Sequence, residues 1–225
     1  MITRYGYDVF FTVTLICVAV IVLSLLFLEP RILRYGISGL AVILLGLTIN
    51  FFRDPNRTTP QGDNFVIAPA DGKIIAVRQV DEREYLGSKA TLVCIFMSPL
   101  NVHVNRNPIT GVVRHLRYVP GEYFAAFEDK ASEKNEQMIV GLENARGKVM
   151  FKQIAGFIAR RIVCTLKMGE QVRAGDRFGM IKFGSRVDVF IPEGAVVRAK
   201  VGDRIPRVAP RQPGHCQYRQ QSKRQ

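Results

Sequence analysis

The chain has 225 residues and a formal net charge of +13 at pH 7, a length that fits one good-sized domain with an attachment. Its four cysteines are scattered, with no C-x-x-C pair. This spacing argues against a disulfide framework and against a zinc site, and it fits a reducing compartment.

Two uncharged apolar runs come first. Residues 9–28 are 20 residues long, which as a helix span about 30 Å, the thickness of a bilayer's hydrocarbon core. Residues 37–52 form a shorter run of 16 residues, which Ile32 and Leu33 can extend. Because a tight connection with a proline joins the runs, we predict a transmembrane helical hairpin over residues 1–52, with both ends on one side of the membrane.

A cleaved signal peptide is the alternative reading of the first run. The run is longer than an ordinary signal-peptide core, and no small-residue cleavage pattern follows Leu28. We therefore expect a retained anchor, followed by a polar linker over residues 53–64. Two arginines in the connection balance two arginines after the hairpin, so charge alone does not orient it.

From residue 65 onward the sequence consists of short β-type runs divided by Gly, Pro and Asp. Helical periodicity is nearly absent here, except around residues 121–131. We predict strands over residues 66–68, 73–80, 91–97, 111–118, 137–142, 148–154, 158–166, 177–183, 186–191 and 196–201. The spacing indicates a mostly β, mostly antiparallel domain over residues 65–208.

Two segments of this domain resemble each other. Residues 169–176 and 196–203 each place a valine and a Gly-Asp pair in similar order. Such turns recur in lipoyl- and biotinyl-type β-sandwiches, so we expect a lipoyl/biotinyl-like β-sandwich with additions.

The positive charge is concentrated at the end of the chain. Residues 198–225 carry eight Lys or Arg against one Asp, a net charge of +7. A basic protein tethered to a bilayer most simply meets anionic lipid headgroups, at about 1 kcal/mol per basic residue near the surface. Nucleic acid is the rival partner, but the anchor and the lack of a recognisable nucleic-acid module argue against it. We expect residues 209–225 to be a basic, disordered tail.

Gly184-Ser185, in an apolar and β-rich segment, is a place where a chain can cut itself. The serine hydroxyl attacks the preceding carbonyl, and the amide becomes an ester. Glycine suits the first position because it lacks a Cβ and tolerates a strained backbone. Elimination of the ester gives dehydroalanine, which hydrolyses to a pyruvoyl group, a carbonyl that accepts electrons. An ordinary turn is the alternative meaning of the same pair.

Three further segments decide between these readings. In chain order the four segments are Phe51-Phe52-Arg53-Asp54-Pro55, Ala68-Pro69-Ala70-Asp71-Gly72-Lys73, Met97-Ser98-Pro99-Leu100-Asn101-Val102-His103-Val104-Asn105 and Phe183-Gly184-Ser185. With these segments the chain resembles phosphatidylserine decarboxylase proenzymes, and most closely the short form with an N-terminal membrane hairpin. The resemblance covers nearly everything from Phe51 to about Pro192.

The resemblance implies a membrane-bound enzyme that activates itself. Cleavage between Gly184 and Ser185 gives a β chain, residues 1–184, and an α chain, residues 185–225, which stay associated. The pyruvoyl group made from Ser185 forms a Schiff base with phosphatidylserine, and loss of CO2 yields phosphatidylethanolamine without a metal or an added cofactor. The resemblance and the unpaired cysteines place the catalytic domain on the cytoplasmic face of the cell (inner) membrane.

Self-cleavage needs a base for the Ser185 hydroxyl, and an Asp-His-Ser arrangement supplies one. The positions that match the family's motifs are Asp71 and His103. The structural alternatives are a turn aspartate before Gly72 and a histidine that serves only packing. His115, inside a predicted strand, is expected to be structural.

One position departs from the family's pattern. Longer bacterial members carry two histidines three residues apart in this segment, whereas here the second position is Arg106. Either His103 serves both processing and the later protonation of the product, or another group takes one role. Arg106 is a candidate for binding the lipid phosphate or carboxylate, and a solvated surface arginine is the alternative.

Two other functions remain open from the residues alone. One is a membrane-tethered carrier or binding module in which Gly184-Ser185 is only a turn. The other is a decarboxylase of the same chemistry that acts on a related serine-headgroup lipid.

Overall fold

The computed structural model describes residues 1–59, 65–126, 131–156, 161–182, 185–205 and 218–220. The chain consists of two compact units, Met1–Pro55 and Asn56–Gln225. Within the described residues, the first unit contains the two long helices and the second contains the named strands.

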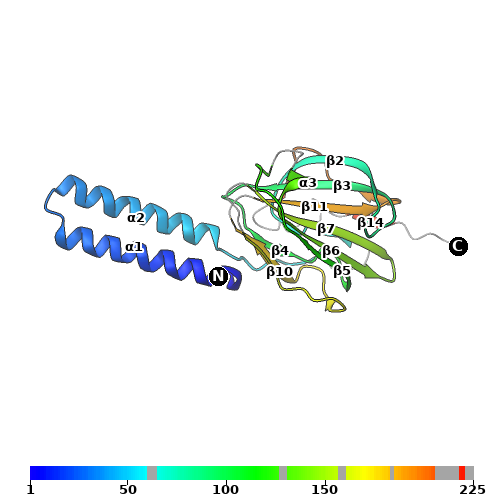
Figure 1. Ribbon diagram of the computed structural model, residues 1–225, viewed down its shortest axis with the longest axis horizontal. Helices are drawn as coiled ribbons and strands as arrows, with labels where there is room; N and C mark the ends of the chain where they lie inside the picture. Colours follow the sequence, from blue (N-terminus) through cyan, green and yellow to red (C-terminus); the bar gives the residue numbers. More distant parts are fainter. Residues whose placement is uncertain (60–64, 127–130, 157–160, 183–184, 206–217, 221–225) are drawn as a thin grey trace. The chain divides into compact units, whose positions relative to one another are not determined.

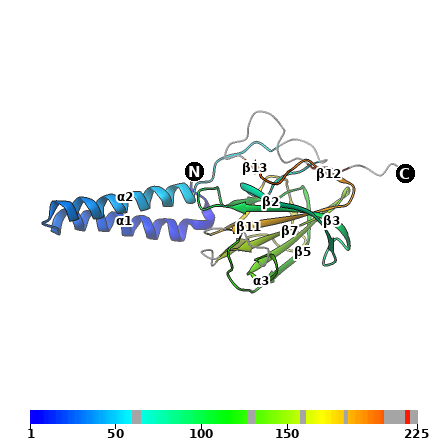
Figure 2. The same ribbon diagram turned by 90° about the horizontal axis from the view of Figure 1, so that it is seen from above.

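Two helices, α1 (Tyr7–Phe27) and α2 (Arg31–Phe51), lie side by side in the first unit (Figures 1 and 2). Pro30 stands directly before α2, where its missing N–H breaks no helical hydrogen bond. The hydroxyls of Ser24 and Ser38 join the two helices at 2.7 Å. Each helix has 21 residues and is apolar and long enough to cross a bilayer, so the predicted pair of N-terminal apolar helices is confirmed.

The start of the chain folds back to the end of α2. A short 3₁₀ helix, η1 (Arg4–Gly6), precedes α1, and Ile2 forms an antiparallel bridge with Arg53. The backbone N–H of Thr3 donates to the carbonyl of Phe52 at 2.9 Å. The two ends of the hairpin therefore lie next to each other.

Eight strands of the second unit form one antiparallel sheet, the large sheet. Their spatial order is β13 (Arg204–Ile205), β2 (Gly72–Glu82), β3 (Ser88–Met97), β11 (Ser185–Pro192), β7 (Gly147–Ala155), β6 (Gln137–Asn144), β5 (Gly111–Val119) and β9 (Gln171–Val172). Two three-stranded sheets accompany it, in the orders β4 (Val104–Arg106), β10 (Arg177–Ile181), β8 (Ile162–Cys164) and β1 (Phe65–Val66), β14 (Tyr218–Gln220), β12 (Ala195–Val197). A single helical turn, α3 (Ala131–Lys134), precedes β6.

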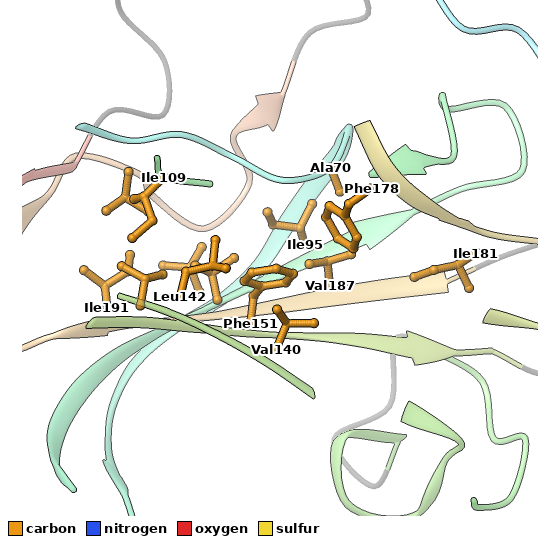
Figure 3. Packing of buried hydrophobic residues seen from close by; sticks show 14 of the residues in the cluster. Ala70, Ile95, Ile109, Val140, Leu142, Phe151, Phe178, Ile181, Val187 and Ile191 are labelled. Carbon is orange, nitrogen blue, oxygen red and sulfur yellow. The ribbon is translucent and has the colours of Figure 1, made fainter. Parts of the chain in front are cut away.

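The main hydrophobic core lies on one face of the large sheet. Alternate residues of β11, among them Val187 and Val189, are fully buried there, because successive side chains of a strand point to opposite faces. Figure 3 shows Phe151 of β7 and Phe178 of β10 in this core, and their ring centroids are 5.2 Å apart. Strand β10 therefore covers the face of the large sheet to which the side chain of Ser185 points.

The two similar sequence segments form the same turn. In each, the N–H of the aspartate donates to a carbonyl three residues earlier, at 3.2 Å for Asp176 and 3.1 Å for Asp203. The preceding residues, Gly175 and Gly202, have φ angles of +84° and +97°. This left-handed conformation at the third turn position is the one that favours glycine.

The prediction of a mostly β domain behind two apolar helices is confirmed. The curled antiparallel sheet is compatible with a lipoyl/biotinyl-like sandwich. Of the tail for which we expected disorder, the structure describes only Tyr218–Gln220, which forms β14 between β1 and β12. The helical periodicity near residues 121–131 leads to the single turn α3, with residues 127–130 outside the described residues.

Candidate active site

Ser185 is the first residue of β11, at the centre of the large sheet. It pairs with Met97 of β3 on one side and with Ala155 of β7 on the other. Its side chain is fully buried, and its hydroxyl donates to the sulfur of Met97 at 3.4 Å. A thioether is a weak acceptor, so this contact leaves the hydroxyl easy to redirect toward a base. Gly184, the other predicted residue of the cleavage site, lies outside the described residues.

His103 lies in the loop between β3 and β4 and is fully buried. Its Nδ1 is 3.0 Å from the carbonyl oxygen of Asn101. Because a carbonyl only accepts, Nδ1 carries the hydrogen, and in the neutral ring the basic lone pair is on Nε2. The carbonyl of His103 accepts from the N–H of Ile181 at 3.4 Å, which ties this loop to the end of β10, four residues before Ser185.

Asp71 stands directly before β2 and is buried, with an ion pair to Arg57. The next residue, Gly72, packs so closely against β3 that an added Cβ would lie 2.2 Å from the carbonyl oxygen of Phe96. Phe96 precedes Met97, the pairing partner of Ser185. The start of β2, the end of β3 and the start of β11 therefore meet at one end of the large sheet.

The structure thus places Asp71, His103 and Ser185 at the same end of the large sheet. Arg106, the other candidate of this segment, has hydrogen-bond partners that differ from those of His103. Its backbone N–H donates to the carbonyl of Pro69 at 2.9 Å, and its guanidinium Nη1 donates to the carbonyl of Gly175, also at 2.9 Å. The first bond holds β4 beside the segment that leads to Asp71, and the second ties the Arg106 side chain to the turn before β10.

A buried chain of amides next to Ser185 was missed by the sequence reasoning. Asn105 Nδ2 donates to the same Met97 sulfur at 3.8 Å, and Gln153 Nε2 donates to Asn105 Oδ1 at 2.8 Å. All three side chains are fully buried. The signal in the sequence is Gln153 itself, which stands at a position of β7 that alternates with Phe151 and Val149 and is therefore expected to face the core.

The opposite face of β11 carries a second buried polar group. Arg186 Nε pairs with Asp188 Oδ1 at 2.6 Å, and both side chains are 1% exposed. Ser132 donates to the other oxygen of Asp188 at 2.8 Å, and Arg186 donates to the sulfur of Cys94 at 2.7 Å. Burial, aided by the charge of Asp188, raises the pKa of the Cys94 thiol to about 12, so it stays protonated at neutral pH.

His115, expected to be structural, lies on β5 away from this end of the sheet. Its Nε2 is 2.9 Å from Glu84, which also accepts from Arg117 at 2.7 Å. Among the described residues, no group of three His, Cys, Asp or Glu side chains is placed to hold a metal ion.

The comparisons with known proteins agree on one family. The model of the phosphatidylserine decarboxylase family matches residues 44–208. Phosphatidylserine decarboxylase proenzymes of Chlorobium luteolum and Pelodictyon phaeoclathratiforme are 48% and 47% identical to the chain over 202 and 205 residues. These matches cover 90% and 91% of this chain and 94% and 95% of the two relatives. The chain therefore belongs to the phosphatidylserine decarboxylase family.

Proposed function

We propose that this chain is a membrane-bound proenzyme that cuts itself between Gly184 and Ser185 and then decarboxylates phosphatidylserine to phosphatidylethanolamine. The observation that carries the proposal is the position of Ser185. It is buried at the first residue of a central strand, at the same end of the sheet as Asp71 and His103. The carrier-module reading has no comparable support, because the family is that of a decarboxylase.

Self-cleavage begins with the Ser185 hydroxyl. His103 Nε2 takes its proton, and the oxygen attacks the carbonyl carbon of Gly184, so that the C–N bond breaks and an ester forms. The Asn101 carbonyl holds the Nδ1–H of the imidazole, and the negative charge of Asp71, at the same end of the sheet, is our proposed support for the positive charge that develops on the ring. Elimination then releases the Gly184 carboxylate, and hydrolysis of the remaining dehydroalanine frees ammonia and leaves the pyruvoyl group.

The residues present fit this prosthetic group, because its precursor is a buried serine that follows a glycine, at the same end of the sheet as a buried histidine. When formed, the pyruvoyl group supplies a carbonyl that withdraws the electrons left behind by CO2. The buried environment around Met97 excludes water from the reacting carbon. His103 is the residue we assign to returning a proton to that carbon, so it serves both stages.

Cleavage leaves residues 1–184 and 185–225 as separate chains that stay associated. The support is the pairing of β11, which is bonded to β3 along its whole length and to β7 from Ser185 to Phe190. Its core residues, such as Val187, are fully buried. Separating the chains would expose this strand on both sides, at a cost that its burial makes large.

The two apolar helices form the anchor, with residues 65–208 as the catalytic domain. We place the anchor in the inner membrane and the catalytic domain on its cytoplasmic face, where reduced cysteines persist. The basic residues 198–225 suit an anionic lipid surface. The role of Arg106 in binding the lipid phosphate or carboxylate stays a prediction.

Intact mass spectrometry of the denatured protein tests the proposal. We expect two fragments that divide after Gly184, the smaller one starting with a pyruvoyl group, and one intact, inactive chain for S185A. A single unbroken wild-type chain from a folded sample would overturn the proposal. Product analysis with defined lipids separates phosphatidylserine from a related serine-headgroup lipid as the substrate.

A further inference from the structure

A cavity of about 620 Å³ opens at the end of the large sheet, beside the candidate active site. Its volume falls within the range of roughly 300–1,000 Å³ typical of small-molecule sites. The lining comes from β2, the end of β3 with the loop after it, and β13. The lining residues that matter here are Lys73, Phe96, Ser98, Leu100, Asn101 and Arg204.

Two cations stand directly opposite each other in the wall of this cavity. Lys73 of β2 is the pairing partner of Arg204 of β13, and both side chains are exposed. Like charges at directly opposed positions of neighbouring strands repel, so this pair costs stability unless an anion bridges it. Within the described part of the chain, neither cation takes part in an ion pair.

The carboxylates nearest in sequence to the two cations are already engaged. Asp71, two residues before Lys73, forms its ion pair with Arg57. Asp203, next to Arg204, accepts from the backbone N–H of Lys200 at 2.9 Å within its own turn. These two carboxylates therefore do not neutralise Lys73 and Arg204, and the two positive charges are available to an anionic ligand.

The other walls combine a donor with apolar surface. Asn101 Oδ1 accepts from the backbone N–H of Ser98 at 2.9 Å and from its hydroxyl at 2.7 Å. This arrangement leaves the amide NH₂ as the donor end of Asn101. Phe96 and the half-exposed Leu100 supply the apolar part. Cations, an amide donor and apolar surface together match an amphiphile with an anionic group.

The cavity adjoins the residues that carry the chemistry. The carbonyl of Asn101 holds His103 Nδ1, and Ser98 follows Met97, the pairing partner of Ser185. Lys73 pairs with Phe96, so both lie on the face of the sheet opposite to the Ser185 side chain. A ligand in the cavity therefore reaches Ser185 around the end of β3, past Ser98.

We propose that this cavity binds the phosphodiester of a phospholipid, with Lys73 and Arg204 as its cationic contacts and Leu100 beside the apolar part of the lipid. The inference rests on the proposed function and identifies the part of the protein that holds the lipid. The phosphodiester comes from the substrate itself or from a neighbouring anionic lipid, and the two sources differ in their kinetics.

The test compares the full-length variant K73Q/R204Q with a control, K89Q/K167Q, that removes two exposed positive charges outside the cavity and outside the basic residues 198–225. Self-cleavage, read from a denaturing gel, reports that each variant folds. The activity is measured on short-chain phosphatidylserine in neutral detergent micelles, and on phosphatidylcholine vesicles containing phosphatidylserine with and without phosphatidylglycerol. The charge-conserving variant K73R/R204K tests rescue.

We expect K73Q/R204Q to cleave itself like the wild type and to show a KM at least tenfold higher in micelles, with kcat within about twofold. K89Q/K167Q and K73R/R204K should keep the wild-type KM. An unchanged KM in micelles, with loss only of the stimulation by phosphatidylglycerol, assigns the site to a neighbouring lipid. An unchanged KM and an unchanged response to phosphatidylglycerol would overturn the inference. Failure of the wild type to cleave itself would instead contradict the proposed function.

Discussion

His103 has the environment of a base that is prepared to accept a proton on Nε2. Its Nδ1 is bonded to a backbone carbonyl, which fixes the tautomer, and its own carbonyl is bonded to β10. A glutamine at this position keeps much of the volume but is not a base at neutral pH. General base catalysis typically contributes about 10²–10⁴-fold, so we expect H103Q to cleave itself slower by that order.

The measurement is the fraction of cleaved chain over time after synthesis in a cell-free system. H115Q is the matched control, because His115 is bonded to Glu84 on another part of the sheet and should leave the rate unchanged. If H103Q cleaves and decarboxylates at wild-type rates, His103 has no part in the mechanism.

At the scale of elements, β11 begins with the new chain end at Ser185, and contacts on both faces of this strand hold it in the fold. Ser185 faces the main core, and Arg186 and Asp188 form a buried ion pair on the opposite face. Removing one partner leaves an uncompensated buried charge, whereas replacing both by apolar residues of similar volume removes the problem. We therefore expect R186M to lower the free energy of unfolding by about 3–5 kcal/mol and R186M/D188L to restore most of that loss.

Urea unfolding in detergent, followed by near-ultraviolet circular dichroism in the uncleavable S185A background, measures both variants. This background keeps the chain in one piece, so the comparison concerns packing alone. Equal stability of R186M and its parent would mean that the ion pair contributes nothing to holding β11.

The strands differ in how well the sequence predicts them. Long strands such as β2 and β3 are rich in β-branched residues and lie between clear turns, so their own residues reveal them. The strands β4, β9 and β13 have only two or three residues, and they exist because longer strands pair with them. Their formation depends on tertiary contacts, which local patterns do not contain.

The residues of the candidate site also fall into two groups, those that local motifs predict and those that only the folded structure brings together. Ser185, Asp71 and His103 stand in short motifs that the sequence displays directly. The contact of Asn105 with Gln153 joins residues 48 positions apart that lie in two different sheets, so no local pattern reveals it. The sequence does not reveal the like-charged pair of Lys73 and Arg204 for the same reason, because the two residues are 131 positions apart in the chain and meet only through the pairing of β2 with β13.

At the scale of the whole molecule, the boundary between the two compact units at Pro55 separates the proposed membrane anchor from the proposed catalytic unit. All three proposed residues of the relay lie in the second unit, which has its own hydrophobic core. A chain lacking Met1–Phe52 should therefore fold and cut itself like the full-length protein. Its substrate, however, is a lipid that stays in a bilayer, and the anchor supplies the high local concentration of enzyme at that surface.

We expect the truncated chain to retain near-normal activity on short-chain phosphatidylserine in micelles and to lose at least tenfold in activity on vesicles. The comparison uses equal amounts of cleaved enzyme, quantified by the small fragment on a denaturing gel. Full vesicle activity without the hairpin would show that the second unit finds the membrane by itself. In that case the basic residues of the second unit, rather than the two helices, would have to supply the attachment.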